Sequence, residues 1–408
     1  MSGSRRWFLR SALTGAGAWL VGGGSGGTAL TDPPSRGESI DTALSMAAAF
    51  LRKQQAEDGA WRSDHYGPFK EGDALTPLVL RTLLAVQDAD AACRKGADYL
   101  AAFVKADGSI EAGRQGLSYP LYTSAGAIEV LSHPSQDRHR KARDGWLAYL
   151  RRRQLTEELG WQPADKPYGG WGYCPTRPRK PKPGEPLAPL TESNLSATVF
   201  ALDALAAAGI QADDPAFRKA LVFVRRCQNF ADDPKQREEA FDDGGFFFIY
   251  DDPVRNKAGA AGKDRSGRER YYSYGSTTAD GWRALLHCGR PADDPRVRAA
   301  RAWMEQQFRA DVHPGKYAAP REGNRGAVYY YYCCSVAQTL RRAGVTELAA
   351  PKGKVRWAEV LAEELIAKQR SDGSWVNLSV PQREDDPLVA TSLAALALAH
   401  CRRALAGE

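Results

Sequence analysis

The chain has 408 residues, of which 43% are hydrophobic and 10% aromatic, and its formal net charge is +7. This composition is typical of a globular protein with a substantial core. The basic residues gather in loop-like runs such as residues 177–183, and the seven cysteines form no CxxC pair. We therefore exclude a nucleic-acid-binding stripe and a small disulfide scaffold.

The first 29 residues have the features of a twin-arginine export signal. SRRWFLR (residues 4–10) precedes a glycine-rich apolar stretch, and the small residues Gly27 and Ala29 stand at positions −3 and −1 of a cleavage site. The stretch is too short to span a bilayer, which takes ~20 helical residues. We expect export to the periplasm or cell envelope. That location is compatible with contact between the protein and the membrane surface. The alternative is a basic amphipathic tail.

A motif of Gln, Asp-Gly and Trp recurs along the rest of the chain. It is complete at residues 55–61 and 369–375, and degenerate copies lie at residues 99–110, 149–173, 223–248 and 303–308. Each copy ends an amphipathic helical segment and precedes a more uniformly apolar one. The apolar segments are residues 73–86, 122–133, 194–209, 274–289, 329–344 and 387–400. Six such pairs predict two concentric layers of helices.

The motif itself predicts a structural clasp. Asp-Gly forms the tight turn that ends the outer helix, because glycine tolerates positive φ. The Trp then folds back over the turn, and the Gln amide bonds the exposed backbone. One clasp per repeat ties neighbouring helix pairs together, and we assign it no catalytic role.

The pattern resembles the QW repeat of squalene and oxidosqualene cyclases and, more loosely, of protein prenyltransferase β subunits. The resemblance covers roughly residues 38–404 and implies an α/α toroid, with six inner and six outer helices around a central cavity. We therefore expect an all-α protein with a single toroidal domain, residues 36–408, after the export signal.

The catalytic motifs of these families are missing. Cyclases use an Asp-x-Asp-Asp acid at the start of an inner helix, and the matching positions here are Asn194, Ser196 and Ala197. Protein prenyltransferases hold zinc through Asp, Cys and His ligands. Their matching positions include Tyr274, Ser276 and Tyr332. We expect neither a metal nor another cofactor.

Polar and aromatic residues take these places. The resemblance implies that the cavity is lined by Tyr122, Asn194, Ser196, Tyr274, Ser276 and Tyr332. Further tyrosines crowd the same helix ends, at positions 119, 271, 272 and 329–331. An aromatic wall suits an isoprenoid or other apolar ligand. The alternative is that these bulky side chains fill the hole.

Asp280 is the candidate catalytic acid, since it lies inside an inner helix one turn after Ser276. The alternative is a carboxylate satisfied by Tyr or Arg. One turn deeper, a charge-balanced ring is expected from Arg81, Glu129, Asp203, Arg283 and Gln338.

Two long inserts, residues 161–192 and 229–273, precede inner helices. We expect both to lie over one mouth of the toroid, as a lid or a partner surface.

Three functions stay open. The protein binds or modifies an isoprenoid-like ligand, it is a non-catalytic scaffold of the cell envelope, or it is a carbohydrate-active α/α barrel. The acids for the last function would be Asp73, Asp242 and Asp243.

Overall fold

The computed structural model describes residues 36–408 except 87–89, 113–115, 251, 352 and 380–382. Residues 36–408 form one compact unit. The expected export signal, residues 1–29, lies outside the described residues.

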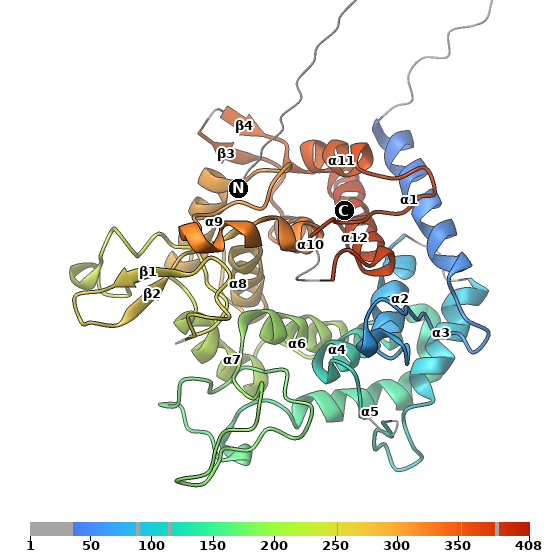
Figure 1. Cartoon of the computed structure of the whole chain (residues 1–408), viewed down its shortest axis with the longest axis horizontal. Coiled ribbons are helices and arrows are strands. Elements are labelled where there is room, and N and C mark those ends of the chain that lie inside the picture. Colours follow the sequence, from blue (N-terminus) through green and yellow to red (C-terminus); the bar gives the residue numbers. More distant parts are fainter. Residues whose placement is uncertain (1–35, 87–89, 113–115, 251, 352, 380–382) are drawn as a thin grey trace, which may run out of the picture. The chain divides into compact units, whose positions relative to one another are not determined.

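Twelve α-helices in the described part of the chain alternate between an outer and an inner layer (Figure 1). The outer helices are α1 (Arg36–Lys53), α3 (Ala91–Ala101), α5 (Arg140–Arg151), α7 (Pro215–Arg226), α9 (Pro295–Gln307) and α11 (Trp357–Ala367). The inner helices are α2 (Leu75–Ala85), α4 (Pro120–Leu131), α6 (Leu195–Ala207), α8 (Gly275–His287), α10 (Tyr329–Arg342) and α12 (Pro387–Ala406).

The inner helices close into a ring. Each packs against the next in chain order, and α12 packs against α2 as well as α10. Each outer helix lies against an inner helix, and α1 contacts α11 and α12 at the point of closure. The predicted all-α toroid of six inner and six outer helices is confirmed.

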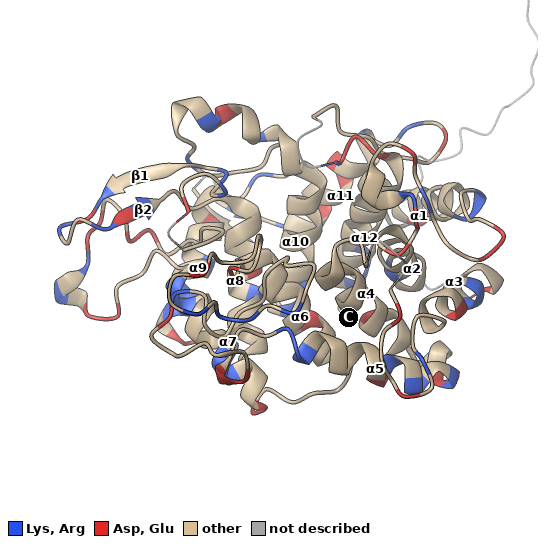
Figure 2. Ribbon diagram, turned by 60° about the horizontal axis from the view of Figure 1, so that its bottom comes forward, with Lys and Arg blue, Asp and Glu red and all other residues tan. Residues whose placement is uncertain are grey.

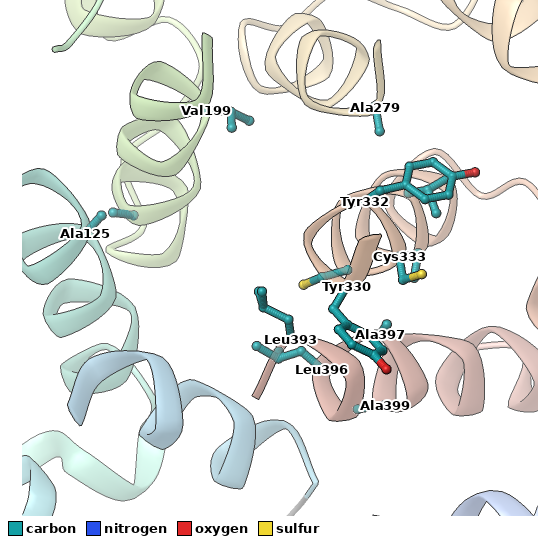
Figure 3. Packing of buried hydrophobic residues seen from close by; sticks show 14 of the residues in the cluster. Ala125, Val199, Ala279, Tyr330, Tyr332, Cys333, Leu393, Leu396, Ala397 and Ala399 are labelled. Atoms are coloured by element: carbon teal, nitrogen blue, oxygen red, sulfur yellow. The ribbon is translucent and has the colours of Figure 1, made fainter. Parts of the chain in front are cut away.

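Burial separates the two layers. Every residue of α12 from 388 to 401 is buried. Figure 3 shows buried residues that α4, α6, α8, α10 and α12 contribute to the core. By length and hydropathy α12 could cross a membrane, but 78% of its apolar stretch is buried within the ring. The charged residues lie mainly on the outer helices and the loops (Figure 2).

The clasps have the predicted hydrogen bonds. Gln55 Nε2 donates to the carbonyl of Gly59 in its own turn and to that of Ala92 in the next outer helix, both at 2.9 Å. Trp61 folds back and donates from Nε1 to the Leu51 carbonyl at 2.6 Å. The same three-way pattern recurs in the third repeat, around Gln154 and Trp171.

The sixth clasp closes the ring. Gln369 Nε2 donates to Gly373 O at 3.0 Å and to Ala43 O of α1 at 2.9 Å. Trp375 Nε1 donates to Leu365 O at 2.8 Å. The last repeat is therefore tied to the first by the same kind of hydrogen bond that ties the first repeat to the second.

Glycine is required in the clasp for two reasons. Gly169 has φ +88°, and a Cβ built there would lie 1.9 Å from the carbonyl oxygen of Lys219 in α7. Gly59 has φ +91°, and its Cβ would lie 2.5 Å from Lys95 O in α3. The turn needs a left-handed residue, and the adjacent outer helix leaves no room for a side chain.

Short elements fill the connections. Two antiparallel hairpins pair β1 (Ala260–Lys263) with β2 (Glu269–Tyr271) and β3 (Leu348–Ala350) with β4 (Gly353–Val355). Single 3-10 turns span Gly67–Phe69, Pro134–His139, Glu157–Leu159, Pro234–Gln236, Ala319–Asn324 and Gly326–Val328.

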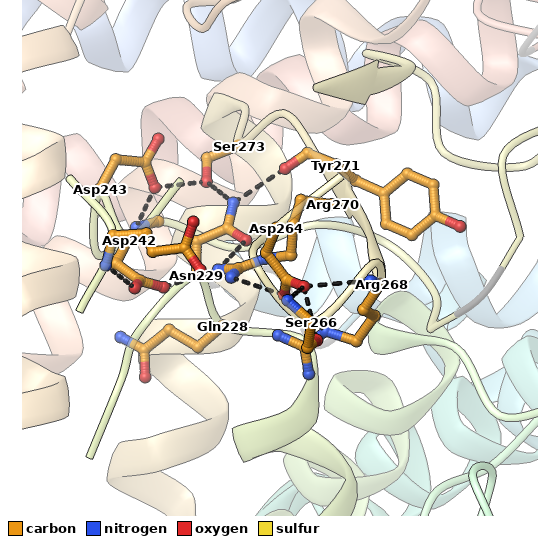
Figure 4. Close-up of polar contacts among 12 residues, drawn as sticks. Gln228, Asn229, Asp242, Asp243, Asp264, Ser266, Arg268, Arg270, Tyr271 and Ser273 are labelled. Atoms are coloured by element: carbon orange, nitrogen blue, oxygen red, sulfur yellow. Dashed lines mark hydrogen bonds and ion pairs between the residues drawn. The ribbon is translucent and has the colours of Figure 1, made fainter. Parts of the chain in front are cut away.

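The second insert is held by a buried polar cluster (Figure 4). Arg270 pairs with Asp242 at 2.6 Å, and the Asn229 amide donates to Tyr271 O and Ser273 Oγ, both at 2.9 Å. The β1–β2 hairpin extends away from the ring in Figures 1 and 2.

Candidate functional site

A chain of hydrogen bonds links four inner helices near their N-terminal ends. The Ser196 hydroxyl of α6 lies 3.1 Å from the Tyr122 hydroxyl of α4 and 2.6 Å from the Tyr331 hydroxyl of α10. The Tyr122 hydroxyl also bonds that of Tyr173. Since α8 stands between α6 and α10 in the ring, the bond between Ser196 and Tyr331 joins two inner helices that are not neighbours.

The chain of bonds ends on Asp280. Tyr331 donates to Asp280 Oδ2 at 2.7 Å, Arg283 donates to Oδ1 at 3.1 Å, and the Ser335 hydroxyl also donates to Oδ1. Asp280 is fully buried. Burial raises the pKa of its carboxyl, and the Arg283 charge opposes that rise. Both carboxylate oxygens are therefore occupied, and Tyr331 covers one of them.

Six aromatic rings make a continuous row at the same level, which we call the aromatic row. Successive ring centroids lie 5.7, 6.2, 6.4, 4.8 and 6.3 Å apart. Phe69 is buried, and the other five are part-exposed. The members are Tyr66, Phe69, Tyr119, Tyr122, Phe200 and Tyr331.

Two cations lie over this row. The Arg81 guanidinium of α2 is 5.4 Å from the Phe200 ring, and that of Arg383 is 4.9 Å from the Tyr119 ring. Tyr119 and Arg383 both have positive φ, at 48° and 66°. Such backbone is costly for residues with side chains and gathers at functional sites.

A charged layer adjoins the row and shares Arg81 with it. Arg81 pairs with Glu129 at 2.9 Å, Arg283 pairs with Asp203 at 3.2 Å, and His287 lies 2.6 Å from Asp203. Burial raises the pKa of Glu129 to about 7, against the Arg81 charge. Burial alone would raise the pKa of Asp203 too, but Arg283 and His287 hold it below its usual range. Four of the five residues expected in the charge-balanced ring therefore form two ion pairs, Arg81 with Glu129 and Arg283 with Asp203.

No protein-family model and no curated protein matches this sequence. A variant of the type II terpene cyclase MstE from Scytonema, in complex with its substrate geranylgeranyl dihydroxybenzoate, is similar in structure. It is 12% identical over 91% of this chain and 99% of that chain, with a TM-score of 0.53. An α-1,6-mannanase from Salegentibacter sp. is 11% identical over 90% of this chain and 100% of that chain, with a TM-score of 0.50. The chain has the terpene cyclase-like α/α-toroid fold. At these identities the likeness concerns the fold alone.

The toroid brings together only some of the residues expected to line its cavity. Tyr122, Ser196 and Asp280 share the central chain of bonds. Asn194 is fully buried and caps α6, where its side chain accepts from Ala197 N at 2.9 Å.

The remaining three expected residues surround His313 instead. Tyr332 stacks on the imidazole at 5.0 Å and donates to Arg309 O at 2.7 Å. Tyr274 packs edge-on to it at 5.6 Å, and Ser276 N donates to its Nε2 at 2.9 Å. Burial lowers the pKa of His313 well below its usual range. These residues form a second cluster beside the toroid axis.

The three acids offered for glycan hydrolysis are held in other ways. Asp242 pairs with Arg270, and Asp243 accepts from Ser273 Oγ at 2.8 Å and Trp303 Nε1 at 3.2 Å. Burial raises the pKa of Asp73 to about 6, and its Oδ2 accepts from Ser118 N at 2.6 Å. Asp73 and Asp242 are buried, whereas Asp243 is exposed.

Several residues of this site escaped sequence reasoning, among them Phe200, Tyr173, His313 and Lys257, whose charge acts on His313. Phe200 was readable as an apolar helix residue, but its part exposure follows from ring closure. His313 and Lys257 lie in connections between helices, where no helical periodicity in the sequence predicts which way a side chain points. Within the described ranges, no group of three or more His, Cys, Asp or Glu side chains could hold a metal ion.

Proposed function

We propose that this protein binds an apolar, isoprenoid-like molecule against the aromatic row, and that it works outside the cytoplasm after export. The observation that carries the proposal is the row itself, with four part-exposed rings in succession, Tyr119, Tyr122, Phe200 and Tyr331. Ring faces attract hydrocarbon chains by dispersion. Ligand sites are typically apolar walls with a few placed polar groups.

The polar groups of the site favour binding over chemistry. A general acid must offer its proton to the ligand. Asp280 is fully buried, and its two oxygens accept from Tyr331, Ser335 and Arg283. The group that reaches the row is the Tyr331 hydroxyl, whose oxygen can accept a hydrogen bond from an alcohol. Asp280 is therefore a positioning residue for Tyr331.

The fold offers a precedent. MstE, a toroid of the same fold, has been captured with geranylgeranyl dihydroxybenzoate, a molecule with a long isoprenoid tail. The mannanase has the same fold and a different ligand class. The aromatic row and the side-chain partners of Asp242 and Asp243 favour the apolar ligand for this chain.

Native mass spectrometry of the exported protein, with solvent extraction of bound lipid, tests the proposal. We expect a co-purifying isoprenoid, or saturable binding of geranylgeraniol by the emptied protein. Phe200→Ala should weaken that binding at least tenfold. Phe103→Ala, which removes a part-exposed ring at the end of α3, is the matched control and should leave it unchanged.

An empty protein that binds no isoprenoid alcohol would overturn the proposal, as would equal losses in the two variants. Export has its own test. A reporter that is active only after folded translocation, fused to residues 1–35, should require the pair Arg5 and Arg6. Export that is unaffected by Lys at both positions would contradict the twin-arginine route.

A further inference from the structure

The Arg383 guanidinium lies at the end of the aromatic row that is opposite Tyr331. Its carbon is 5.0, 5.6 and 4.9 Å from the ring centroids of Tyr66, Phe69 and Tyr119. These three rings begin the row, and Tyr331 ends it. Aromatic rings attract a cation that lies over them. Three ring contacts therefore place this cation on the row.

The hydrogen-bond donors of Arg383 are unused. Its Nη1 is buried without a partner, and within the described ranges the guanidinium makes neither a hydrogen bond nor an ion pair. The other cation on the row, Arg81, is paired with Glu129 at 2.9 Å. A partly desolvated charge without an acceptor is costly. The Arg383 side chain is part-exposed, so a ligand can reach the donors that the rings leave open.

The backbone that carries Arg383 is held in place. The carboxylate of the next residue, Glu384, accepts from two backbone N–H groups of α10 at 2.8 and 3.0 Å. Asp386 caps α12 by accepting from the N–H of Leu388 at 2.8 Å. Arg383 itself has φ +66°, a conformation that persists where the surroundings fix it. The guanidinium is therefore presented from a fixed loop end.

Tyr66 keeps a nearby carboxylate away from this guanidinium. The charge of Asp385 acts on Arg383, but the Asp385 carboxylate accepts from the Tyr66 hydroxyl at 2.7 Å. The ring of the same tyrosine lies against the guanidinium. Burial lowers the pKa of Arg383, yet a guanidinium stays charged at neutral pH. The cation is thus left available for an anion from outside the chain.

We propose that Arg383 binds the carboxylate head group of an amphipathic acid whose isoprenoid-like tail lies along the aromatic row. The inference rests on the proposed function and names the head-group chemistry of its ligand. A carboxylate matches the planar donor fork of a guanidinium. A phosphate would bring a charge of about −1.5 to −2 close to Asp385. A single negative charge is therefore the better fit.

Three ligands with the same tail test the inference: geranylgeranoic acid, geranylgeraniol and geranylgeranyl phosphate. Their dissociation constants for the whole protein are measured by native mass spectrometry near neutral pH. We expect the acid to bind at least about tenfold more tightly than the alcohol, through charge-assisted hydrogen bonds. It should also bind more tightly than the phosphate. This comparison uses the natural protein, so it does not depend on the folding of a variant.

Two variants of Arg383 locate the head group. Arg383→Met should lower the affinity for the acid to that for the alcohol, while the affinity for the alcohol itself changes little. Arg383→Lys keeps the charge without the planar fork, so it should recover only part of the affinity for the acid. Lys316→Met is the matched control, because it removes an exposed cation that lies 5.0 Å from the Tyr272 ring. It should leave all three affinities unchanged.

Several results would overturn the carboxylate site. One is an acid that binds no more tightly than the alcohol, and another is a phosphate that binds more tightly than the acid. Equal losses of acid and alcohol in Arg383→Met would make this residue a support for the rings alone. Equal losses of acid binding in Arg383→Met and Lys316→Met would assign the effect to surface charge.

The alcohol shows which proposal has failed. If geranylgeraniol binds the natural protein and the acid binds no better, the aromatic row stands and the carboxylate site falls. If the natural protein binds none of the three ligands, the proposed function itself falls.

Discussion

Tyr331 donates its hydroxyl to Asp280 at 2.7 Å and so links α10 to α8, while its backbone N–H is held by Glu384. One tyrosine is thus fixed at both its ring end and its backbone. The Ser196 hydroxyl 2.6 Å away extends this link to α6. The position of the aromatic row therefore depends on buried hydrogen bonds, and Asp280 is best understood through the tyrosine that it holds.

Tyr331→Phe should destabilise the protein by about 1–3 kcal/mol, because it leaves Asp280 Oδ2 buried without its donor. Tyr330→Phe is the matched control, since the Tyr330 ring is buried but its backbone N–H makes the bond to Glu384. Urea denaturation measures both. Equal losses in the two variants would contradict the role given to the Tyr331 hydroxyl.

Gln55→Ala should lower the free energy of unfolding by about 1–3 kcal/mol, because the Gly59 and Ala92 carbonyls both lose their donor. Gln54→Ala changes the exposed residue beside it and should cost less than ~0.5 kcal/mol. Thermal and urea unfolding of the pair measure the clasp. If the clasp contributes nothing to stability, the two variants will have the same free energy of unfolding.

Gly169→Ala and Gly184→Ala separate crowding from backbone strain. The two glycines have nearly the same φ, +88° and +85°. A Cβ at Gly169 would meet Lys219 O at 1.9 Å, whereas one at Gly184 meets nothing within 4 Å. We expect about 1–2 kcal/mol of destabilisation at Gly184 from the left-handed backbone alone. At Gly169 the loss should exceed ~4 kcal/mol. Comparable unfolding midpoints would show that α7 can move aside.

Glu384 should make stability depend on pH. Burial raises the pKa of its carboxyl to about 7, from the 4.5 of a free glutamate. Between these values the folded state binds more protons than the unfolded state, so stability falls as pH rises through the window. The full loss is on the order of 3 kcal/mol.

Glu384→Gln removes this titration, so the variant should lose less stability than the natural protein between pH 4.5 and 8. Glu57→Gln, at an exposed position, should keep the natural dependence. Urea unfolding at several pH values gives the comparison. An unchanged pH profile in Glu384→Gln would assign the effect to other groups.

The sequence was sufficient for the ring and for the clasps, because both repeat. Each of the six apolar segments contains or overlaps one inner helix, and Gln55 and Gln369 make the bonds that their spacing predicts. Because the motif repeats, a degenerate copy can be recognised by its similarity to a complete one. Gln154, whose Trp171 is delayed by an insertion, makes the same contacts as the complete copies.

The site was harder to predict because it depends on helix phase. Four consecutive tyrosines begin α10, and each step along a helix turns the side chain by roughly 100°. Matching to the family selected Tyr332, whose hydroxyl bonds Arg309 O, whereas Tyr331 reaches Asp280 and Ser196. Lys257 comes from a connection, and only folding brings it under the influence of Asp280 and Glu384.

The bond from Gln369 to Ala43 has a consequence for how the molecule comes apart. A linear stack of helical repeats has terminal units that fray first and need polar caps. Here the sixth helix pair packs against the first, so every helix pair has a neighbouring pair on both sides. Unfolding of this part of the chain should therefore be one cooperative event rather than a progressive peeling from an end.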